Sequence, residues 1–100
     1  MSETERDRLR RLFEDLRQDG RSIHEYVASF LALSRYARII LPTKRERIAN
    51  FVRGLDYAFQ EKAFTLTRTP GMTLSDIIEL CRAYELMLSE KVTDSKGERP

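Results

Sequence analysis

The sequence predicts an all-α fold, a compact bundle of five helices, on the strength of three observations. Apolar residues recur at spacings of three and four in five segments, which is the period of a helix with one buried face. Three of these segments open with a serine or threonine that an acidic residue follows three positions later, a pattern that starts helices. No stretch alternates apolar and polar residues over the length of a strand.

The first helix is expected to run from Thr4 to Arg17. Thr4 and Asp7 form its expected N-terminal cap, and Gly20 is expected to end it in a left-handed conformation. One apolar stripe follows the helical period and is formed by Leu9, Leu12, Phe13 and Leu16.

The second helix is expected from Ser22 to about Ala37, with Ser22 and Glu25 as its capping box. Its apolar face is formed by Ile23, Tyr26, Val27, Phe30, Leu31 and Leu33. A face this wide is typical of the central helix in a small bundle. Pro42 disfavours helical angles at the residue before it, so residues 38–42 are expected to form an apolar connection.

The third helix is expected to begin at Thr43, which forms a capping box with Glu46. It is expected to end near Arg53, with Gly54 as its C-terminal cap. Its apolar stripe is formed by Ile48, Phe51, Val52 and Leu55.

The fourth helix is expected over residues 57–67, with Asp56 as its N-terminal cap. Phe59, Ala63 and Leu66 form its face, and Phe64 lies beside it. The last helix is expected to follow Thr73 and Asp76, the third capping pair, and to run to about Ser89. Its inward residues are Leu74, Ile77, Ile78, Cys81, Tyr84 and Leu88.

One helical domain is expected over residues 1–89. Residues 90–100 are polar and aperiodic, which predicts a disordered tail or a linker. The 18 basic and 16 acidic side chains are interleaved, a balance that argues against a dedicated nucleic-acid binder. One cysteine cannot form an internal disulfide, and no apolar run is long enough to span a bilayer. We therefore expect an intracellular, cytoplasmic protein without a membrane segment.

The side-chain inventory argues against an enzyme. His24 and Cys81 are the only histidine and cysteine, too few for a structural zinc site within the chain. We expect His24 to be exposed in the first turn of its helix and Cys81 to be a small core residue. The glycines are isolated, so no phosphate-binding loop is present. We assign no catalytic residue, cofactor or metal ligand.

Two basic clusters, within residues 6–11 and 44–53, have two interpretations. They predict contact with RNA or with an acidic surface of a neighbouring subunit. The alternative is an ordinary charged helix face, which is favoured because acidic residues lie close by in the sequence.

Three segments, residues 16–33, 47–55 and 72–85, resemble in order and spacing the Gag capsid proteins of gypsy-type LTR retrotransposons and retroviruses. Domesticated relatives such as the neuronal Arc protein belong to the same group. The first segment resembles the major homology region, the second is similar to the "RFVRGL" segment, and the third looks like the closing helix. The residues that carry the resemblance and the expected core are Gln18, Gly20, Ser22, Ile23, Glu25, Tyr26, Val27, Phe30, Leu33, Phe51, Val52, Gly54 and Leu55.

The polar half of the first segment departs from the retroviral pattern. Asp19 separates Gln18 from Gly20, which are adjacent in retroviruses. Arg21 and Ser29 stand where the retroviral motif has a glutamate and an arginine. The apolar half is retained, which fits the retrotransposon branch better than an orthoretrovirus.

The resemblance implies a bundle of the capsid C-terminal-domain type that dimerises and helps Gag subunits assemble a capsid-like particle around RNA. The dimer contact would use the third helix, whose outward residues include Lys44, Arg45, Ala49 and Arg53. This face is polar, so we expect a weak dimer or a monomer in isolation, with assembly driven by many copies. The implied partners are further Gag subunits, and RNA is expected to bind mainly through regions outside this fragment.

Two alternatives stay open. A domesticated host adaptor domain would keep the fold and bind a peptide or protein partner. A nucleic-acid-binding helical domain would show RNA affinity that falls steeply with salt. An upstream capsid-type helical domain and a downstream Cys-x2-Cys-x4-His-x4-Cys zinc knuckle in the gene would favour the capsid interpretation over the adaptor.

Overall fold

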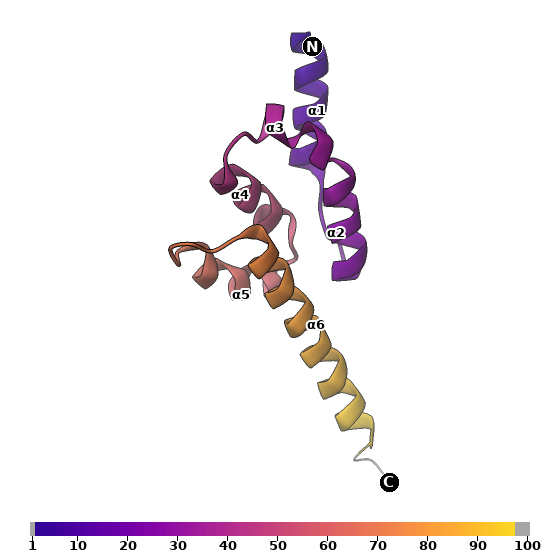
Figure 1. Cartoon of the computed structure of the whole chain (residues 1–100). Coiled ribbons are helices and arrows are strands. Elements are labelled where there is room, and N and C mark those ends of the chain that lie inside the picture. Colours follow the sequence, from indigo (N-terminus) through magenta and orange to yellow (C-terminus); the bar gives the residue numbers. More distant parts are fainter. Residues whose placement is uncertain (1, 98–100) are drawn as a thin grey trace.

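The computed structural model describes the backbone of residues 2–97 and the side chains of residues 2–90. Within these residues the chain is all-helical, without a strand, which confirms the all-α part of the predicted fold class. The described residues form six α-helices, where five were expected (Figure 1). The elements are α1 (Glu3–Asp15), α2 (Ile23–Ala32), the 3₁₀ turn η1 (Ser34–Tyr36), α3 (Ala37–Ile40), α4 (Lys44–Gly54), α5 (Tyr57–Thr67) and α6 (Leu74–Gly97).

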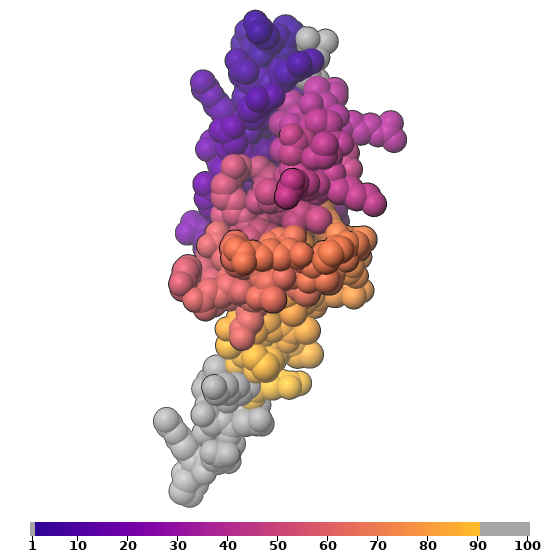
Figure 2. Space-filling view, turned by 90° about the vertical axis from the view of Figure 1, so that its left-hand side faces the viewer, coloured from indigo at the N-terminus to yellow at the C-terminus, as the bar shows by residue number. Residues whose placement is uncertain are grey.

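The helices form an elongated body with α1 and α6 extending from opposite ends (Figure 1). α1 packs against α3 and α4, α2 packs against α6, and α5 lies between α4 and α6. Figure 2 shows the same outline from the side, with α1 in indigo at one end and the first part of α6 in yellow toward the other.

Aromatic rings join the N-terminal half of the body. Phe13 of α1 meets Phe30 of α2 edge to face, with 6.2 Å between ring centroids. Phe51 of α4 lies 5.3 Å from Phe30 and 5.0 Å from Tyr26. All four rings are buried, and edge-to-face pairs of this kind add to the free energy gained from burying their area. The stripes of three helices therefore meet in one core.

Two of the three predicted capping boxes are complete. At α4, the Thr43 hydroxyl accepts from the Glu46 N–H, and the Glu46 carboxylate accepts from the Thr43 N–H, each at 3.1 Å. At α6, Thr73 and Asp76 make the same reciprocal pair at 3.0 and 3.1 Å. These predictions are confirmed because both partners lie within one turn of chain.

The starts of α1 and α2 differ from expectation. At α2, Ser22 accepts from the Glu25 N–H as predicted, but the Glu25 carboxylate accepts from the Ser22 hydroxyl instead of a backbone N–H. At α1, the Thr4 cap is wrong: Ser2 is the N-cap and accepts from the Glu5 N–H at 3.1 Å. Thr4 lies inside the helix.

The expected second helix is interrupted. α2 ends at Ala32, and 3₁₀-type hydrogen bonds follow, with the Leu33 N–H donating to the Phe30 carbonyl at 3.1 Å. After η1, residues 37–40 form α3, where an apolar connection was expected over residues 38–42. This change of direction buries Ala37 and Ile40, and α3 packs against α1.

α6 continues to Gly97, beyond the expected end near Ser89. The expectation of a disordered tail or a linker over residues 90–100 stays a prediction, and residues 98–100 lie outside the described residues. Neither proline nor glycine interrupts residues 74–96, so the sequence contains no helix breaker there. Within the described part of the chain, no helix is long and apolar enough to cross a membrane.

Two glycines have roles other than those expected. α1 already ends at Asp15, so Gly20 does not cap it; Gly20 instead forms a turn with Asp19, both at positive φ (78° and 49°). Gly54 is the last residue of α4 and is not left-handed. A β-carbon there would lie 2.6 Å from the Leu16 carbonyl oxygen, so the close approach of α1 and α4 requires glycine.

Candidate interaction surface

Gln18 is buried and joins the loop before α2 to the connection between α4 and α5. Its side-chain nitrogen donates to the Arg21 carbonyl at 2.9 Å, and its side-chain oxygen accepts from the Asp56 N–H at 3.0 Å. Its backbone N–H donates to the Gly54 carbonyl at 2.7 Å. A 2% exposed amide that uses both its donor and its acceptor fixes the position of the loop.

Asp56 reinforces this connection in a way the sequence did not predict. It occupies the N-cap position of α5, but its side chain does not cap that helix. Its carboxylate accepts from the Gly20 N–H at 3.0 Å instead. The turn at Asp19 and Gly20 aims this N–H away from α2 and toward α5, so the aspartate holds two segments together.

Arg21 and Ser29, two of the residues that depart from the retroviral pattern, contact each other. One terminal nitrogen of Arg21 donates to the Ser29 hydroxyl of α2 at 2.9 Å. Its other side-chain nitrogens donate to the carbonyls of Arg17 and Gln18 at 2.7 and 3.2 Å. The Arg21 guanidinium therefore links the loop before α2 to Ser29 of α2.

α2 is also hydrogen-bonded to α4 and α6. The Tyr26 hydroxyl donates to the Phe51 carbonyl at 2.7 Å, and burial raises the pKa of this hydroxyl far above its ordinary value. The Ile23 N–H donates to the Glu85 carboxylate of α6 at 2.8 Å. Among the described side chains, no buried nitrogen or oxygen lacks a partner. The buried polar side chains of this network are therefore satisfied within the fold, and the network holds α2 in place.

The remaining residues of the expected motif and core are distributed between the interior and the surface. Val27, Phe30, Leu55 and Gly54 are buried, Ser22, Leu33 and Val52 are half-buried, and Gly20 and Glu25 are exposed.

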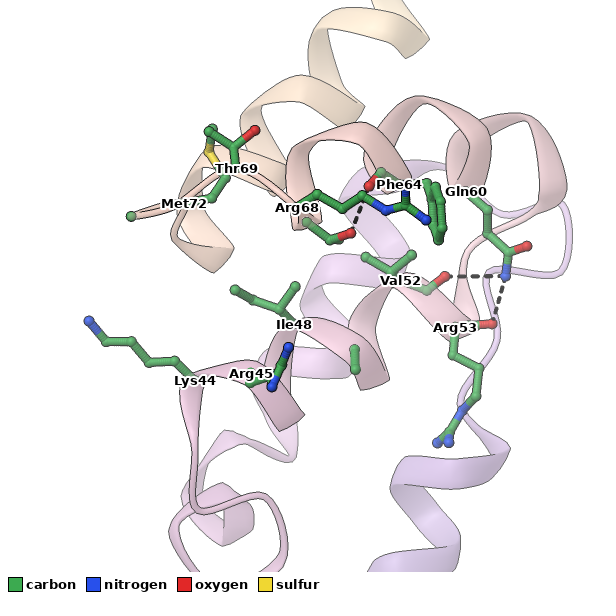
Figure 3. Close-up of a pocket in the computed structure, with 13 residues that line it drawn as sticks. Lys44, Arg45, Ile48, Val52, Arg53, Gln60, Phe64, Arg68, Thr69 and Met72 are labelled. Carbon is green, nitrogen blue, oxygen red and sulfur yellow. Dashed lines mark hydrogen bonds between the residues drawn. The ribbon is translucent and has the colours of Figure 1, made fainter.

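The four residues of the expected dimer face lie together on α4 and are exposed. Lys44, Arg45, Ala49 and Arg53 all line one open groove between α4 and α5 (Figure 3). Its volume is about 900 Å³, which lies in the range of ligand and peptide sites. Gln60 fixes one end of the groove by donating to the Val52 and Arg53 carbonyls at 3.3 and 3.0 Å.

The groove combines an apolar floor with a basic rim. Ile48 and Val52 of α4 face Phe64 of α5, which is 55% exposed. The Arg68 guanidinium stacks on the Phe64 ring, 4.5 Å from its centroid, and Met72 closes the far end (Figure 3). The sequence did not predict that Phe64, Arg68 and Met72 line this surface. The position of Phe64 beside the stripe of its helix was the available signal.

The chain's histidine and its cysteine lie in different surroundings. His24 is exposed, and Cys81 is 1% exposed in the core. Burial, with a smaller contribution from the nearby Glu85 carboxylate, raises the pKa of the Cys81 thiol to about 11. Within the described residues, no three His, Cys, Asp or Glu side chains are grouped to hold a metal ion.

Comparisons with protein-family models, with curated proteins and with solved structures give no match for this chain.

Proposed function

We propose that this chain is the structural assembly domain of a Gag-like capsid protein. In this proposal it has the bundle type of a capsid C-terminal domain, acts without catalysis and works in the cytoplasm. It associates with further copies, and the resulting capsid-like particle encloses RNA that is bound mainly by regions outside residues 1–100.

One observation carries this proposal. The three segments that resemble Gag proteins are far apart in the sequence, yet their residues form one connected unit. The Gln18 N–H donates to the Gly54 carbonyl of the second segment, and the Tyr26 hydroxyl donates to the Phe51 carbonyl of the same segment. The Ile23 N–H donates to the Glu85 carboxylate of the third segment. If the three matches to Gag segments had arisen by chance, these segments would have no reason to be hydrogen-bonded to one another.

The proposed contact between copies is the exposed face of α4 with Lys44, Arg45, Ala49 and Arg53. Two copies meeting symmetrically on this face bring cations together, which costs free energy. A single contact is therefore weak, and a particle requires many of them at once.

Light scattering over a concentration series tests self-association. We expect a monomer at low concentration and at most a weak dimer at high micromolar concentration. A tight dimer at nanomolar concentration would contradict the weakness of the contact. Electron microscopy of the full-length protein tests particle formation, and the absence of particles at high concentration would contradict the capsid proposal.

The groove favours a second candidate, a domesticated adaptor that binds a peptide or protein through the same fold. An exposed aromatic ring beside an apolar floor is a common feature of peptide-binding surfaces. In this case particles would be absent, and a partner would bind the isolated chain.

A further inference from the structure

The groove between α4 and α5 has a charge balance unlike the rest of the chain. Basic and acidic side chains are nearly equal in number overall, 18 and 16. The residues that line the groove include four cations, Lys44, Arg45, Arg53 and Arg68, and no carboxylate. The groove therefore attracts a negatively charged occupant.

Two of these cations stand where helix stability disfavours them. Lys44 and Arg45 are the first two residues of α4, and the partial positive charge of a helix N-terminus repels basic side chains. Glu46 lies in the same turn, but its carboxylate accepts from the Thr43 N–H and makes no ion pair with either cation. Among the described residues, no ion pair engages Lys44 or Arg45. Both cations are available to a partner.

The floor of the groove specifies the shape of the occupant. Ile48 and Val52 are one helical turn apart on α4 and face Phe64. α4 has eleven residues and is about 16 Å long, so an occupant of about three helical turns would cover the floor. An amphipathic helix laid in such a groove buries its apolar side and keeps its charged side toward the rim.

Two other occupants fit less well. A nucleobase would need an open aromatic face, and the Arg68 guanidinium already covers one face of Phe64. A second copy of this chain would place its own Lys44 and Arg45 against the same cations.

We infer that the groove between α4 and α5 binds an acidic amphipathic helix of a partner protein. Leucine-like side chains of the partner contact Ile48, Val52 and Phe64, and its carboxylates pair with the rim cations. This inference needs only the groove and does not depend on particle assembly. Because the same α4 residues are used, the partner and a second copy would exclude each other.

The test is fluorescence anisotropy with a labelled peptide of about 18 residues, built with leucine on one helical face and glutamate on the other. The control peptide has lysine in place of every glutamate. We expect the acidic peptide to bind and the basic one to bind at least about tenfold more weakly. We expect Lys44→Glu with Arg45→Glu to weaken acidic-peptide binding about tenfold, while the matched pair Arg8→Glu with Arg11→Glu on α1 leaves it unchanged.

A second variant tests the apolar floor without disturbing the core. Phe64 is more than half exposed, so Phe64→Ser should leave thermal unfolding unchanged and weaken acidic-peptide binding about tenfold. Equal binding of both peptides, equal loss in the two charge-reversal pairs, or tighter binding of a single-stranded RNA of equal charge would overturn the inference. None of these outcomes bears on whether the chain forms particles.

Discussion

The hydroxyl oxygen of Tyr26 fills the space in which a β-carbon of residue 54 would lie, so Tyr26 and Gly54 pack without room between them. The same hydroxyl donates to the Phe51 carbonyl at 2.7 Å, one turn earlier on α4. The close contact and the hydrogen bond together set the distance between α2 and α4.

Gly54→Ala is expected to destabilise the fold by about 1–3 kcal/mol, the usual cost of overpacking a tight site. Urea unfolding followed by circular dichroism measures the change. Gly71→Ala is the matched control, because Gly71 is left-handed (φ 81°) with no atom near its missing β-carbon. Its cost should be smaller, about 1 kcal/mol. Equal stability of Gly54→Ala and the unmodified chain would refute the proposed contact.

Tyr26→Phe should cost about 1–3 kcal/mol, because it leaves the buried Phe51 carbonyl without its donor. Removing the hydroxyl also makes space beside residue 54. In a double-mutant cycle with Gly54→Ala, the double variant should therefore lose less unfolding free energy than the sum of the two single variants' losses. Strict additivity would show that the hydroxyl and the glycine act independently.

Phe30→Ala should cost about 3–5 kcal/mol, since it removes the ring that joins Phe13 to Phe51. Its chain neighbour provides a control: Leu31 is 51% exposed, and Leu31→Ala should stay within about 0.5 kcal/mol of the unmodified chain. Thermal unfolding of the two variants side by side measures the difference. Similar melting temperatures would mean that the core is assigned wrongly.

Stability should fall at alkaline pH. Cys81 is neutral in the folded state until the pH nears its raised pKa of about 11, whereas in the unfolded chain it ionises near its ordinary pKa of about 9. Ionisation therefore favours the unfolded state between these two values, and below about pH 9 the group has no effect. Thermal unfolding from pH 7 to 10.5 measures the loss, and Cys81→Ala should reduce its slope. An identical slope in Cys81→Ala would contradict the burial of the thiol.

Local patterns predicted much of this fold. The capping pairs at Thr43 and Thr73 were correct because both partners of each pair lie within one turn. The period of apolar residues likewise identified Phe13, Phe30 and Phe51, which the structure buries. Such signals need no knowledge of distant parts of the chain.

Long-range contacts explain what the sequence could not predict. Asp56 reads as a helix cap, but its carboxylate is taken by Gly20, 36 residues away. Asn50 reads as a surface residue, yet it is buried and donates to the Phe13 carbonyl of α1 at 3.1 Å. Each of these roles depends on which helices become neighbours.

The candidate surface was only half predictable for the same reason. The α4 side, with Lys44 and Arg45, follows from the helical period of one segment. The α5 side, with Phe64 and Arg68, joins it only because α5 turns back along α4 (Figure 3).

Sedimentation equilibrium of the chain tests the central claim, that the exposed face of α4 is where copies associate. We expect the average molecular mass to rise with concentration. Added salt should strengthen association, because it screens the cations that face each other. Arg45→Glu should strengthen association by pairing with Lys44 of the other copy, and the control Arg8→Glu on α1 should not. Association that weakens as salt is added, or the same response in both variants, would contradict it.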